Sequence, residues 1–598
     1  MNTDISLQRV AARIATLLAH RRLPVALAIL APVLLLPAFG AGWQLDDFFH
    51  RSRILGYGDA HPLQLFVPYD GSPEHNVRQM EAGTLPWWAS PNLHLAFLRY
   101  TSTLTMLLDY QLWPNHPEWM HLHSLLWLSA TVVAVTLLYR RVLGATWVAG
   151  LAAVLYAVDD AHALPTTYLA NRNALIATCL GVLSIVGFVR WRQDAWRWGG
   201  WLSALLLALA LSGGEMALAT AGYLLSYALI LDRGTVRQRL ACLLPHAVVL
   251  CGWAVIYRVG DFGSHGSGFY LDPVGDPMSF AAGFLDRAPI LLLGQWTPIP
   301  AGLGIALTPG THEAFVLRVV SLAVVAVLAG LLVPVMARDR VARFWGLGVL
   351  LALLPIAAVG PEDRLLFFVG VGSMGLLAQL MQLAFAAEAA VPVARAWRVP
   401  ARVGAMLLLV CHLVVAPVLG LAWVRYQAKV SAAMLGAIAS VPSDPQIARQ
   451  DLIVVNPPDH IYVVTAIPVV KELEHVPVPR RIRALSAGTS GLQITRVGPR
   501  ALRVAFPNGL FQTVFSRYLH GTDESFHVGQ RVELSGFAAE VQHLNAHGDP
   551  DEVLYEFAVP LEDPALRWVR WQDGVYVPWR PPALGQTEEL PPSRGIFG

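Results

Sequence analysis

The sequence predicts an all-α polytopic membrane domain of about eleven transmembrane helices, followed by a small β-rich soluble domain. Three observations indicate this fold class. The 598 residues are 55% hydrophobic and only 14% charged, which is too little charge to cover a soluble protein of this length. Apolar stretches long enough to cross a bilayer recur over residues 23–425. Short alternating segments replace these stretches from about residue 426 onward.

The first apolar stretch covers residues 23–42 and follows a basic segment, residues 1–22. A signal peptide is the alternative, but the stretch has about the length of a spanning helix and lacks a small-residue cleavage site after a short core. We therefore expect a retained first span. The other expected spans are residues 121–139, 146–159, 173–189, 199–212, 215–231, 240–257, 314–337, 343–360, 364–386 and 402–424. The split within 199–231 is the weakest of these, and residues 281–297 are a candidate extra or re-entrant helix.

The arginines predict the orientation of the spans. If the N-terminus is cytoplasmic, every expected inner loop is basic, which is the asymmetry that sets topology. The arginines concerned are Arg140, Arg141, Arg190, Arg192, Arg197, Arg233, Arg237, Arg239, Arg338, Arg340, Arg343, Arg395, Arg398 and Arg402. We therefore predict a multi-pass protein of a bacterial inner membrane, with long outer loops at residues 43–120 and 258–313. The C-terminal domain is then periplasmic.

Residues 426–577 are expected to form the β-rich domain. Its predicted strands are residues 451–455, 461–465, 500–506 and 531–535, which lie between turns rich in Pro, Gly and Asn. Residues 578–598 are rich in proline, and we expect them to be loosely ordered.

The four cysteines fall in apolar segments and are interpreted as small core residues. No cluster has the spacing of a metal site. We expect no metal, no cofactor and no nucleic-acid partner.

An acidic pair, Asp46 and Asp47, lies directly after the first expected span. Carboxylates held partly dehydrated at a membrane boundary are costly, so we interpret the pair as functional. The alternative is a solvated loop or a helix cap. The same outer loop contains Leu85-Pro-Trp-Trp88, whose tryptophans are typical of a segment lying in the headgroup layer.

Other polar residues fall on the same predicted side, each beside a different span. They are Arg99, Asp160, His162, Arg172, Glu215, Glu362 and Arg364. A carboxylate can act as general base toward an attacking hydroxyl, and arginine can hold a phosphate and stabilise its developing charge. Structural roles, such as helix ends and anchoring ion pairs, are the alternatives.

A series of short motifs occurs in one order along residues 23–425. They are Leu45-Asp-Asp-Phe48, Arg99-Tyr-Thr-Ser, Leu108-Asp-Tyr-Gln-Leu-Trp113, His121-Leu-His-Ser124, Asp160-Ala-His162, Tyr168-Leu-Ala-Asn-Arg172-Asn, Gly214-Glu215 and Glu362-Asp-Arg364-Leu-Leu-Phe-Phe368. In these motifs the sequence resembles the C-type glycosyltransferase (GT-C) superfamily. The likeness is closest to the branch of protein O-mannosyltransferases and mannosyltransferases with tetratricopeptide repeats. The sequence departs from the pattern at Ser124 and Gly214, lacks a proline after Arg99, and has no tetratricopeptide array.

The resemblance implies transfer of a sugar from a polyprenyl-phosphate carrier to a hydroxyl of a protein, lipid or polysaccharide, with inversion at the sugar carbon. It implies that Asp46 is the catalytic base and that Asp47 orients or binds. Arg364, with Arg172 or Arg99, would engage the donor phosphate. Glu362, Glu215, Asp160 and His162 complete the expected substrate-binding set.

Two other classes of function stay open. One is a secondary transporter or lipid flippase, although transporters usually place ionisable groups near the bilayer midplane. The other is a non-catalytic assembly protein that keeps the same fold.

Overall fold

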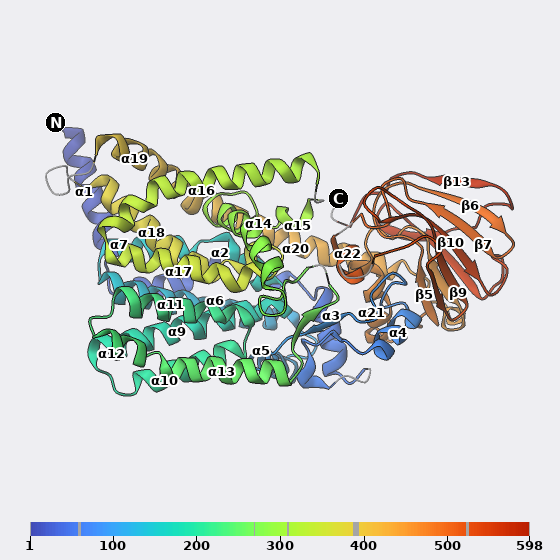
Figure 1. Cartoon of the computed structure of the whole chain (residues 1–598), viewed down its shortest axis with the longest axis horizontal. Coiled ribbons are helices and arrows are strands. Elements are labelled where there is room, and N and C mark those ends of the chain that lie inside the picture. The colour runs from blue at the N-terminus through green and yellow to red at the C-terminus, as the bar shows by residue number, and fades with distance from the viewer. Residues whose placement is uncertain are drawn as a thin grey trace. The chain divides into compact units, whose positions relative to one another are not determined.

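The computed structural model describes residues 2–57, 61–267, 269–307, 310–386, 394–512, 514–521 and 525–596. The chain forms two compact units (Figure 1). Unit 1 comprises Met1–Gly42, Phe97–Phe262 and Leu271–Ala428, and unit 2 comprises Trp43–Ala96, Gly263–Tyr270 and Lys429–Gly598. Each unit is described by itself.

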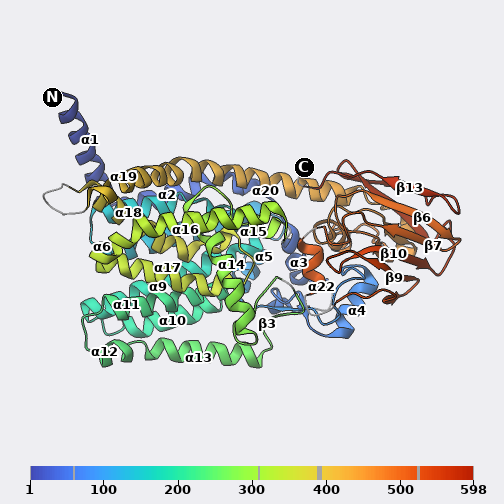
Figure 2. The same ribbon diagram turned by 45° about the horizontal axis from the view of Figure 1, so that its top comes forward.

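Unit 1 is a helical bundle. Its helices are α1 (Asn2–Leu18), α2 (Leu23–Leu34), α5 (Tyr100–Leu112), α6 (Pro117–Leu143), α7 (Trp147–Ala157), α8 (Ala163–Thr167), α9 (Arg172–Asp194), α10 (Gly199–Leu211), α11 (Leu218–Ile230), α12 (Val236–Ala241), α13 (Leu244–Val259), α14 (Pro277–Trp296), α15 (Leu303–Ala306), α16 (His312–Arg338), α17 (Arg340–Ala357), α18 (Phe367–Phe385), α19 (Arg395–Val410) and the first part of α20 (Ala416–Ala439). The long helices run side by side in Figures 1 and 2, with α9 packed against both α6 and α10.

The helical membrane domain is confirmed. Among the described residues, seven helices are long and apolar enough to cross a membrane, or nine if each of two bent pairs is one span. The predicted number of eleven is not confirmed. Residues 199–231 do separate into α10 and α11, and residues 281–296 lie in helix α14. The span in α16 has a mean hydropathy of 2.7 but is only 28% buried within the protein, so its uncovered side chains suit lipid rather than water.

Buried tyrosines in the bundle use their hydroxyls to satisfy backbone carbonyls. Tyr139 donates to the carbonyl of Val371 at 2.6 Å, and Tyr223 donates to that of Phe368 at 2.6 Å. Because no water is available in a bilayer core, such polar groups need partners within the protein. These bonds link α6 and α11 to α18 and make the bundle around α9 a rigid support.

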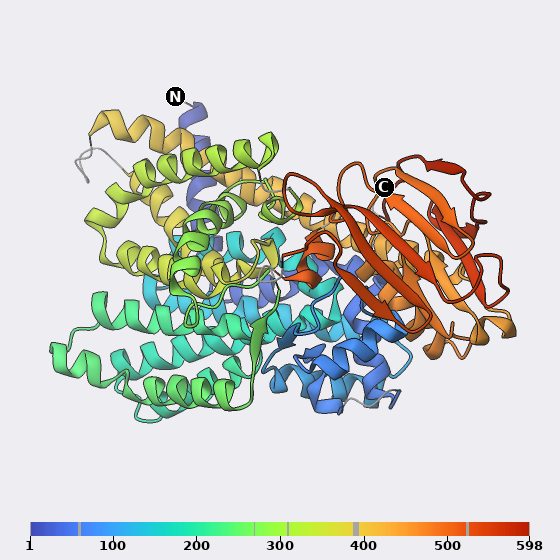
Figure 3. The same cartoon turned by 45° about the vertical axis from the view of Figure 1, so that its right-hand side comes forward.

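Unit 2 contains the C-terminal β-rich region, which is confirmed, and its two larger sheets lie among the orange and red strands of Figure 3. The first sheet is antiparallel, in the order β13 (Thr587–Leu590), β6 (Leu492–Gly498), β7 (Ala501–Ala505), β10 (Pro550–Phe557), β9 (Phe537–Leu544) and β8 (Arg531–Leu534). The second has the order β12 (Val575–Pro578), β11 (Leu566–Gln572), β4 (Asp451–Val454) and β5 (Arg481–Ala484). A small third sheet joins β1 (Tyr69–Asp70), β2 (His94–Ala96) and β3 (Gly263–His265). The helices of this unit are α3 (Leu45–Ile54), α4 (Pro73–Ala82), α21 (Ala466–Leu473) and α22 (Val514–His520), with the end of α20.

Three of the predicted strands correspond to β4, β7 and β8, but the strand predicted at residues 461–465 is wrong. Those residues belong to the helical segment His460–Thr465, which continues into α21. Strand β4 pairs with β5 in parallel, and a parallel connection requires a crossover, usually helical. An apolar run of this length does not distinguish a buried strand from a buried helix.

The tail at residues 578–598 is not loosely ordered throughout, as the sequence suggested. Strand β13 pairs with β6 in the antiparallel sheet, in a register that joins Leu590 to Leu492. The side chain of Leu590 is only 4% exposed. The ladder hydrogen bonds and this buried leucine therefore order a segment that its proline content marked as irregular.

Trp87 and Trp88 of the first outer loop lie in a protein core and not in a headgroup layer, contrary to the prediction for this segment. Trp87 and Trp88 are 4% and 1% exposed and belong to the hydrophobic core of unit 2. The rings of Trp87 and Tyr555 meet edge to face at 6.0 Å. Aromatic side chains suit a protein core as well as an interface, so composition alone could not decide between them.

Residues 43–96 are thus part of unit 2, although the sequence placed them in an outer loop of the membrane domain. The guanidinium of Arg483 donates to the carbonyl of Met80 at 3.0 Å, and its charge pairs with Glu81 at 3.1 Å. Gly83 has a φ of +90°, and a Cβ there would lie 2.1 Å from the carbonyl oxygen of Ile482. This close approach requires glycine. The domain boundaries drawn from the sequence stay a prediction.

Candidate functional site

Several polar side chains of unit 1 meet at the first residues of α9. Arg172, the first residue of that helix, is 1% exposed. It pairs with Asp109 of α5, donates through Nε to Ser124 Oγ at 2.9 Å, and donates to the carbonyl of Met120 at 2.6 Å. One guanidinium therefore joins α9 to both α5 and α6.

His123 extends this cluster. Its Nε2 accepts a hydrogen bond from Trp127 Nε1 at 3.1 Å, so its Nδ1 carries the proton and donates to Asp109 Oδ1 at 2.6 Å. Asp109 consequently receives bonds on both oxygens, one from His123 and one from Arg172. A buried carboxylate needs this degree of pairing. The side chains of Asp109, His123 and Arg172 form a closed scaffold, here called the buried cluster.

Arg364 meets the same helix start from the connection between α17 and α18. Its guanidinium pairs with Glu362 and donates to Asn171 Oδ1 at 2.9 Å. The side chains of Arg364 and Glu362 are 26% and 22% exposed. Unlike Arg172, Arg364 keeps part of its surface exposed.

Two further carboxylates lie beside Arg364. The turn that contains Asp160 contacts the turn that contains Asp363 and Arg364. Asp363 Oδ1 accepts a hydrogen bond from the backbone N–H of Ala301 at 2.9 Å. Burial raises the pKa of Asp363, and these backbone hydrogen bonds oppose the rise. The neighbouring Asp159 accepts a bond from Gln295 Nε2 of α14 at 3.1 Å.

Arg99 and Glu215, two residues singled out from the sequence, form an ion pair with 2.9 Å between Nε and Oε2. Their side chains are 21% and 22% exposed. The segment is held by Ser102, whose hydroxyl donates to the carbonyl of Gly213 at 2.6 Å. A Cβ on Gly214 would lie 3.1 Å from Asn173 of α9, so this pair also stands near the start of that helix.

His162 lies inside the protein. It is 1% exposed and stands between the rings of Tyr156 and Phe367, with centroids 5.0 and 4.9 Å away. These contacts give His162 a packing role. Its predicted contact with substrate stays a prediction.

The acidic pair belongs to unit 2, where it lies at the start of α3. Asp47 is 0% exposed, and its Oδ2 accepts the backbone N–H of Gln44 at 3.0 Å, which caps the helix. Asp46 is exposed. Burial, and after it the charge of Asp46, raises the pKa of Tyr69. The two neighbouring aspartates therefore differ in environment, one structural and one accessible.

The sequence identified most of the charged residues at the start of α9 but not several of their partners. Asp109 lies in the segment Leu108–Trp113 that carries the family resemblance, so a signal for it was present. Asn171 also lies in a segment that carries the resemblance, Tyr168-Leu-Ala-Asn-Arg172-Asn. Gln295 lies in the apolar helix α14, and no motif marks it.

Within the part of the chain that the structure describes, no group of three or more His, Cys, Asp or Glu side chains is arranged to hold a metal ion. Three of the acidic side chains at the start of α9 are paired with arginines. Of these arginines, Arg364 and Arg99 are partly exposed, and an arginine can bind an anionic ligand.

Comparisons with known proteins give only distant likenesses. No protein-family model matches the chain, and no curated protein is similar to it. Among solved structures, ArnT from Cupriavidus metallidurans bound to undecaprenyl phosphate is 14% identical over 78% of this chain and 90% of that one, with a TM-score of 0.37. The apo state of ArnT is 13% identical over 74% and 84%, with a TM-score of 0.36. The apo oligosaccharyltransferase of Archaeoglobus fulgidus is 12% identical over 78% and 64%, with a TM-score of 0.39. These scores are too low to establish a common fold.

Proposed function

We propose that the chain is a membrane glycosyltransferase of the GT-C type, which moves a sugar from a polyprenyl-phosphate carrier to a hydroxyl acceptor. The observation that carries the proposal is the meeting of Arg364, Glu362, Asp160 and the Arg99–Glu215 pair around the start of α9. These residues come from separate segments and lie at one end of an apolar bundle. A ligand with an anionic head and a long apolar chain fits such a place.

Arg364 is the proposed anchor for the donor phosphate. Its ion pair with Glu362 orients the guanidinium before the donor arrives, and its partial exposure leaves room for a second partner. A phosphate can accept paired hydrogen bonds from the fork of an arginine. Arg99 is the second candidate, since its pair with Glu215 has a similar exposure.

Arg172 receives a positioning role in this proposal. Its guanidinium is enclosed and bonded to Asp109, Ser124 and Met120. It fixes the first turn of α9, and with it Asn171, which holds Arg364. Direct contact of Arg172 with the phosphate, which the resemblance implied, would require this cluster to open.

Asp46 is the proposed base, and the support is its place in the Leu45–Phe48 motif together with its exposure. It would take the proton from the acceptor hydroxyl as the acceptor oxygen attacks the sugar carbon. The bond from that carbon to the phosphate oxygen breaks on the opposite face, which inverts the configuration. The electron pair leaves with the polyprenyl phosphate, whose charge Arg364 would stabilise. Asp47 would keep Asp46 in place by capping α3.

The finer points of the proposal come from the motifs and from the arginine-rich loops. The proposed site lies on the periplasmic side of a bacterial inner membrane. The proposed donor is a polyprenyl-phosphate sugar of the kind that the mannosyltransferase-like branch uses, and the acceptor is a protein, lipid or polysaccharide. The positive-inside rule supports the orientation.

The test is a transfer assay with the full chain in proteoliposomes, with radiolabelled polyprenyl-phosphate mannose as donor and a mixed membrane extract as acceptor. Asp46→Asn and Arg364→Gln are each expected to abolish or greatly reduce incorporation. Asp573→Asn is the control for the first, because Asp573 is an exposed residue with a φ of 50°, which asparagine tolerates. Arg318→Gln is the control for the second, because Arg318 pairs with Asp286 on an exposed face.

Full incorporation by Asp46→Asn would refute the assignment of the base. If the wild-type chain transfers no sugar but carries the intact donor or another solute across the vesicle membrane, the transporter or flippase alternative replaces the enzyme. Donor binding in the absence of both activities would favour the assembly protein.

A further inference from the structure

The N-terminal helix α1 carries an exposed apolar stripe. Val10, Ile14 and Leu17 are 52%, 52% and 68% exposed, and their spacing of four and three residues places them on one helical face. Arg9 and Arg13 are also exposed and flank this stripe. Apolar helix faces are normally buried, so an uncovered stripe beside arginines indicates a surface partner.

Helix α1 runs across the direction of the spans. The segment Ala12–Leu18 makes an angle of 87° with Leu23–Leu34 of α2, and Figures 1 and 2 show α1 at one end of the bundle, running steeply to the long helices. If the bundle crosses a membrane, α1 therefore lies along the membrane surface. An amphipathic helix in this orientation can place its apolar face among the acyl chains.

The packing of unit 1 fixes this orientation. A Cβ on Gly150 of α7 would lie 2.0 Å from the carbonyl oxygen of Leu18, so the end of α1 rests directly on the backbone of α7. Arg140, near the end of α6, binds the bend through the carbonyl of Arg21 at 3.1 Å and through that of His20. The bend is thus held by two helices of the bundle rather than left as a free arm.

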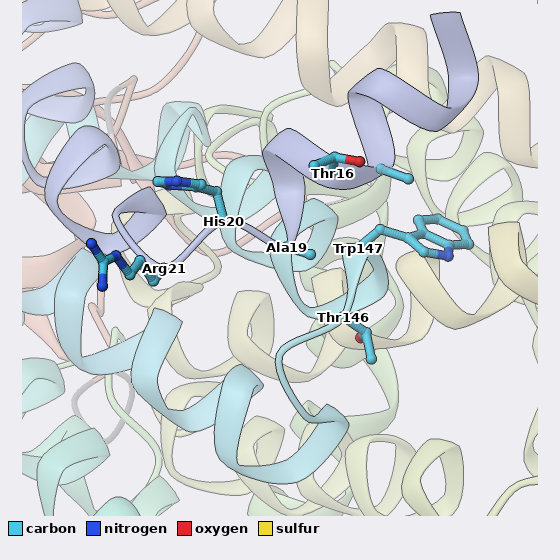
Figure 4. Close-up of a pocket in the computed structure, with 7 residues that line it drawn as sticks. Thr16, Ala19, His20, Arg21, Thr146 and Trp147 are labelled. Carbon is cyan, nitrogen blue, oxygen red and sulfur yellow. The ribbon is translucent and has the colours of Figure 1, made fainter. Parts of the chain in front are cut away.

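A wide-open surface cavity of about 680 Å³ lies beside the bend (Figure 4). Its lining is mainly apolar and comes from α1, the bend and the start of α7: Ala15, Thr16, Ala19, His20, Arg21, Thr146 and Trp147. Tryptophan at the first residue of a spanning helix is typical of the headgroup level. The cavity therefore lies where the edge of a lipid layer would meet the protein.

We propose that α1 is an in-plane anchor that binds a bilayer surface rich in anionic phospholipid. The stripe of Val10, Ile14 and Leu17 enters the acyl boundary, the arginines contact headgroup phosphates, and the cavity beside Trp147 receives one lipid. The positive charge of the segment favours anionic lipid as the partner, because residues 1–22 contain four arginines and a single acidic residue, Asp4. The proposal does not depend on glycosyl transfer.

The first experiment measures the depth of α1 in vesicles with nitroxide labels on the full chain, after its four cysteines are changed to alanine. Ile14→Cys places a label on the stripe, and Ala12→Cys places one on the opposite, exposed side of the same helix. In vesicles that contain phosphatidylglycerol, the label at position 14 should collide several-fold more with oxygen than with a water-soluble nickel chelate. The label at position 12 should show the reverse.

Equal access of the nickel chelate to both labels would overturn the anchor. Burial of position 14 with spin–spin broadening that grows with protein concentration would overturn it too, because a second copy of the chain would then cover the stripe.

The second experiment tests the preference for anionic lipid. Arg9→Gln with Arg13→Gln should make position 14 several-fold more accessible to nickel in phosphatidylglycerol vesicles, whereas Arg500→Gln, an exposed arginine of unit 2, should not. Equal depth of the unsubstituted helix in phosphatidylcholine and phosphatidylglycerol would contradict the charge contribution. Because the label reports without any sugar donor, failure of the transfer assay leaves this result unaffected.

Discussion

Arg172 and Arg364 both meet acidic side chains at the start of α9, yet their surroundings differ. Arg172 is enclosed, with its partners on α5 and α6 in place. Arg364 is 26% exposed and has a carboxylate and an amide beside it. The first arrangement joins three helices of the bundle, and the second leaves part of the arginine exposed.

This difference separates stability from binding among residues of the same type. Removing one partner from a buried ion pair leaves an unpaired charge and is strongly destabilising. A partly exposed pair is expected to lose less when one partner is removed, because solvent can reach the remaining charge. The two arginines should therefore respond differently when each is replaced, and four predictions can sharpen or break the comparison.

The largest effect on stability is expected for Arg172→Met. The change leaves the buried carboxylate of Asp109 without its guanidinium and should destabilise the protein by about 3–5 kcal/mol. Thermal unfolding of the purified chain in detergent measures the loss. Arg364→Met is the comparison and should cost less, because the Arg364–Glu362 pair is partly exposed. Equal unfolding temperatures for the two variants would contradict the view that Arg172 stabilises the fold and Arg364 serves binding.

Arg364→Gln should act on the donor rather than on the fold. Loss of charged hydrogen bonds to phosphate is worth about 1.5–3 kcal/mol, so the KM for the polyprenyl-phosphate sugar should rise by roughly one to two orders of magnitude. A donor titration in the transfer assay measures it, with Arg318→Gln as the matched loss of an arginine. An unchanged KM for Arg364→Gln would remove this residue from the donor site.

The acidic pair gives a smaller contrast in stability. Asp47→Asn weakens the cap of α3 in a buried place and should destabilise unit 2 by about 1 kcal/mol. Asp46→Asn should lower the unfolding temperature less than Asp47→Asn, because Asp46 is exposed. Both variants can be followed by thermal unfolding beside the transfer assay. A destabilised Asp46→Asn would mean that its loss of activity cannot be assigned to a missing base.

The smallest effect concerns pH. Burial raises the pKa of Asp363 above its ordinary value of 3.8. Above about pH 4 the unfolded chain therefore releases this proton first, and the stability of the folded chain falls as pH rises through the higher folded pKa. Asp363→Asn does not titrate at this site. Its unfolding temperature relative to the wild type should rise between pH 4 and pH 7, and a constant difference would contradict the shift.

Much of this architecture could be predicted from the sequence, because the bilayer imposes long apolar helices that are easily recognised. The parallel strands β4 and β5 were harder, since the crossover at His460–Thr465 is as apolar as a strand. The burial of Trp87 and Trp88 could not be predicted either. It depends on contacts with segments more than 350 residues later in the chain, such as the bond from His520 to the carbonyl of Trp88.

The candidate site, too, could be predicted from the sequence only in part. Charge at the ends of spans identified Arg364, Glu215 and Arg99 as members of a polar end of the bundle. Their pairing could not be predicted, because Arg99 and Glu215 meet across 116 residues of sequence. Nor could the sequence distinguish an enclosed arginine from an accessible one, since exposure depends on what packs around each side chain.

The most direct test of the donor site is native mass spectrometry of the lipids that remain on the protein after gentle extraction. The wild-type chain and Arg318→Gln should each retain a polyprenyl phosphate or its sugar conjugate, and Arg364→Gln should retain much less of it. If the wild type carries no such lipid when the donor is supplied, or if Arg364→Gln retains as much as the wild type, the start of α9 does not hold the donor.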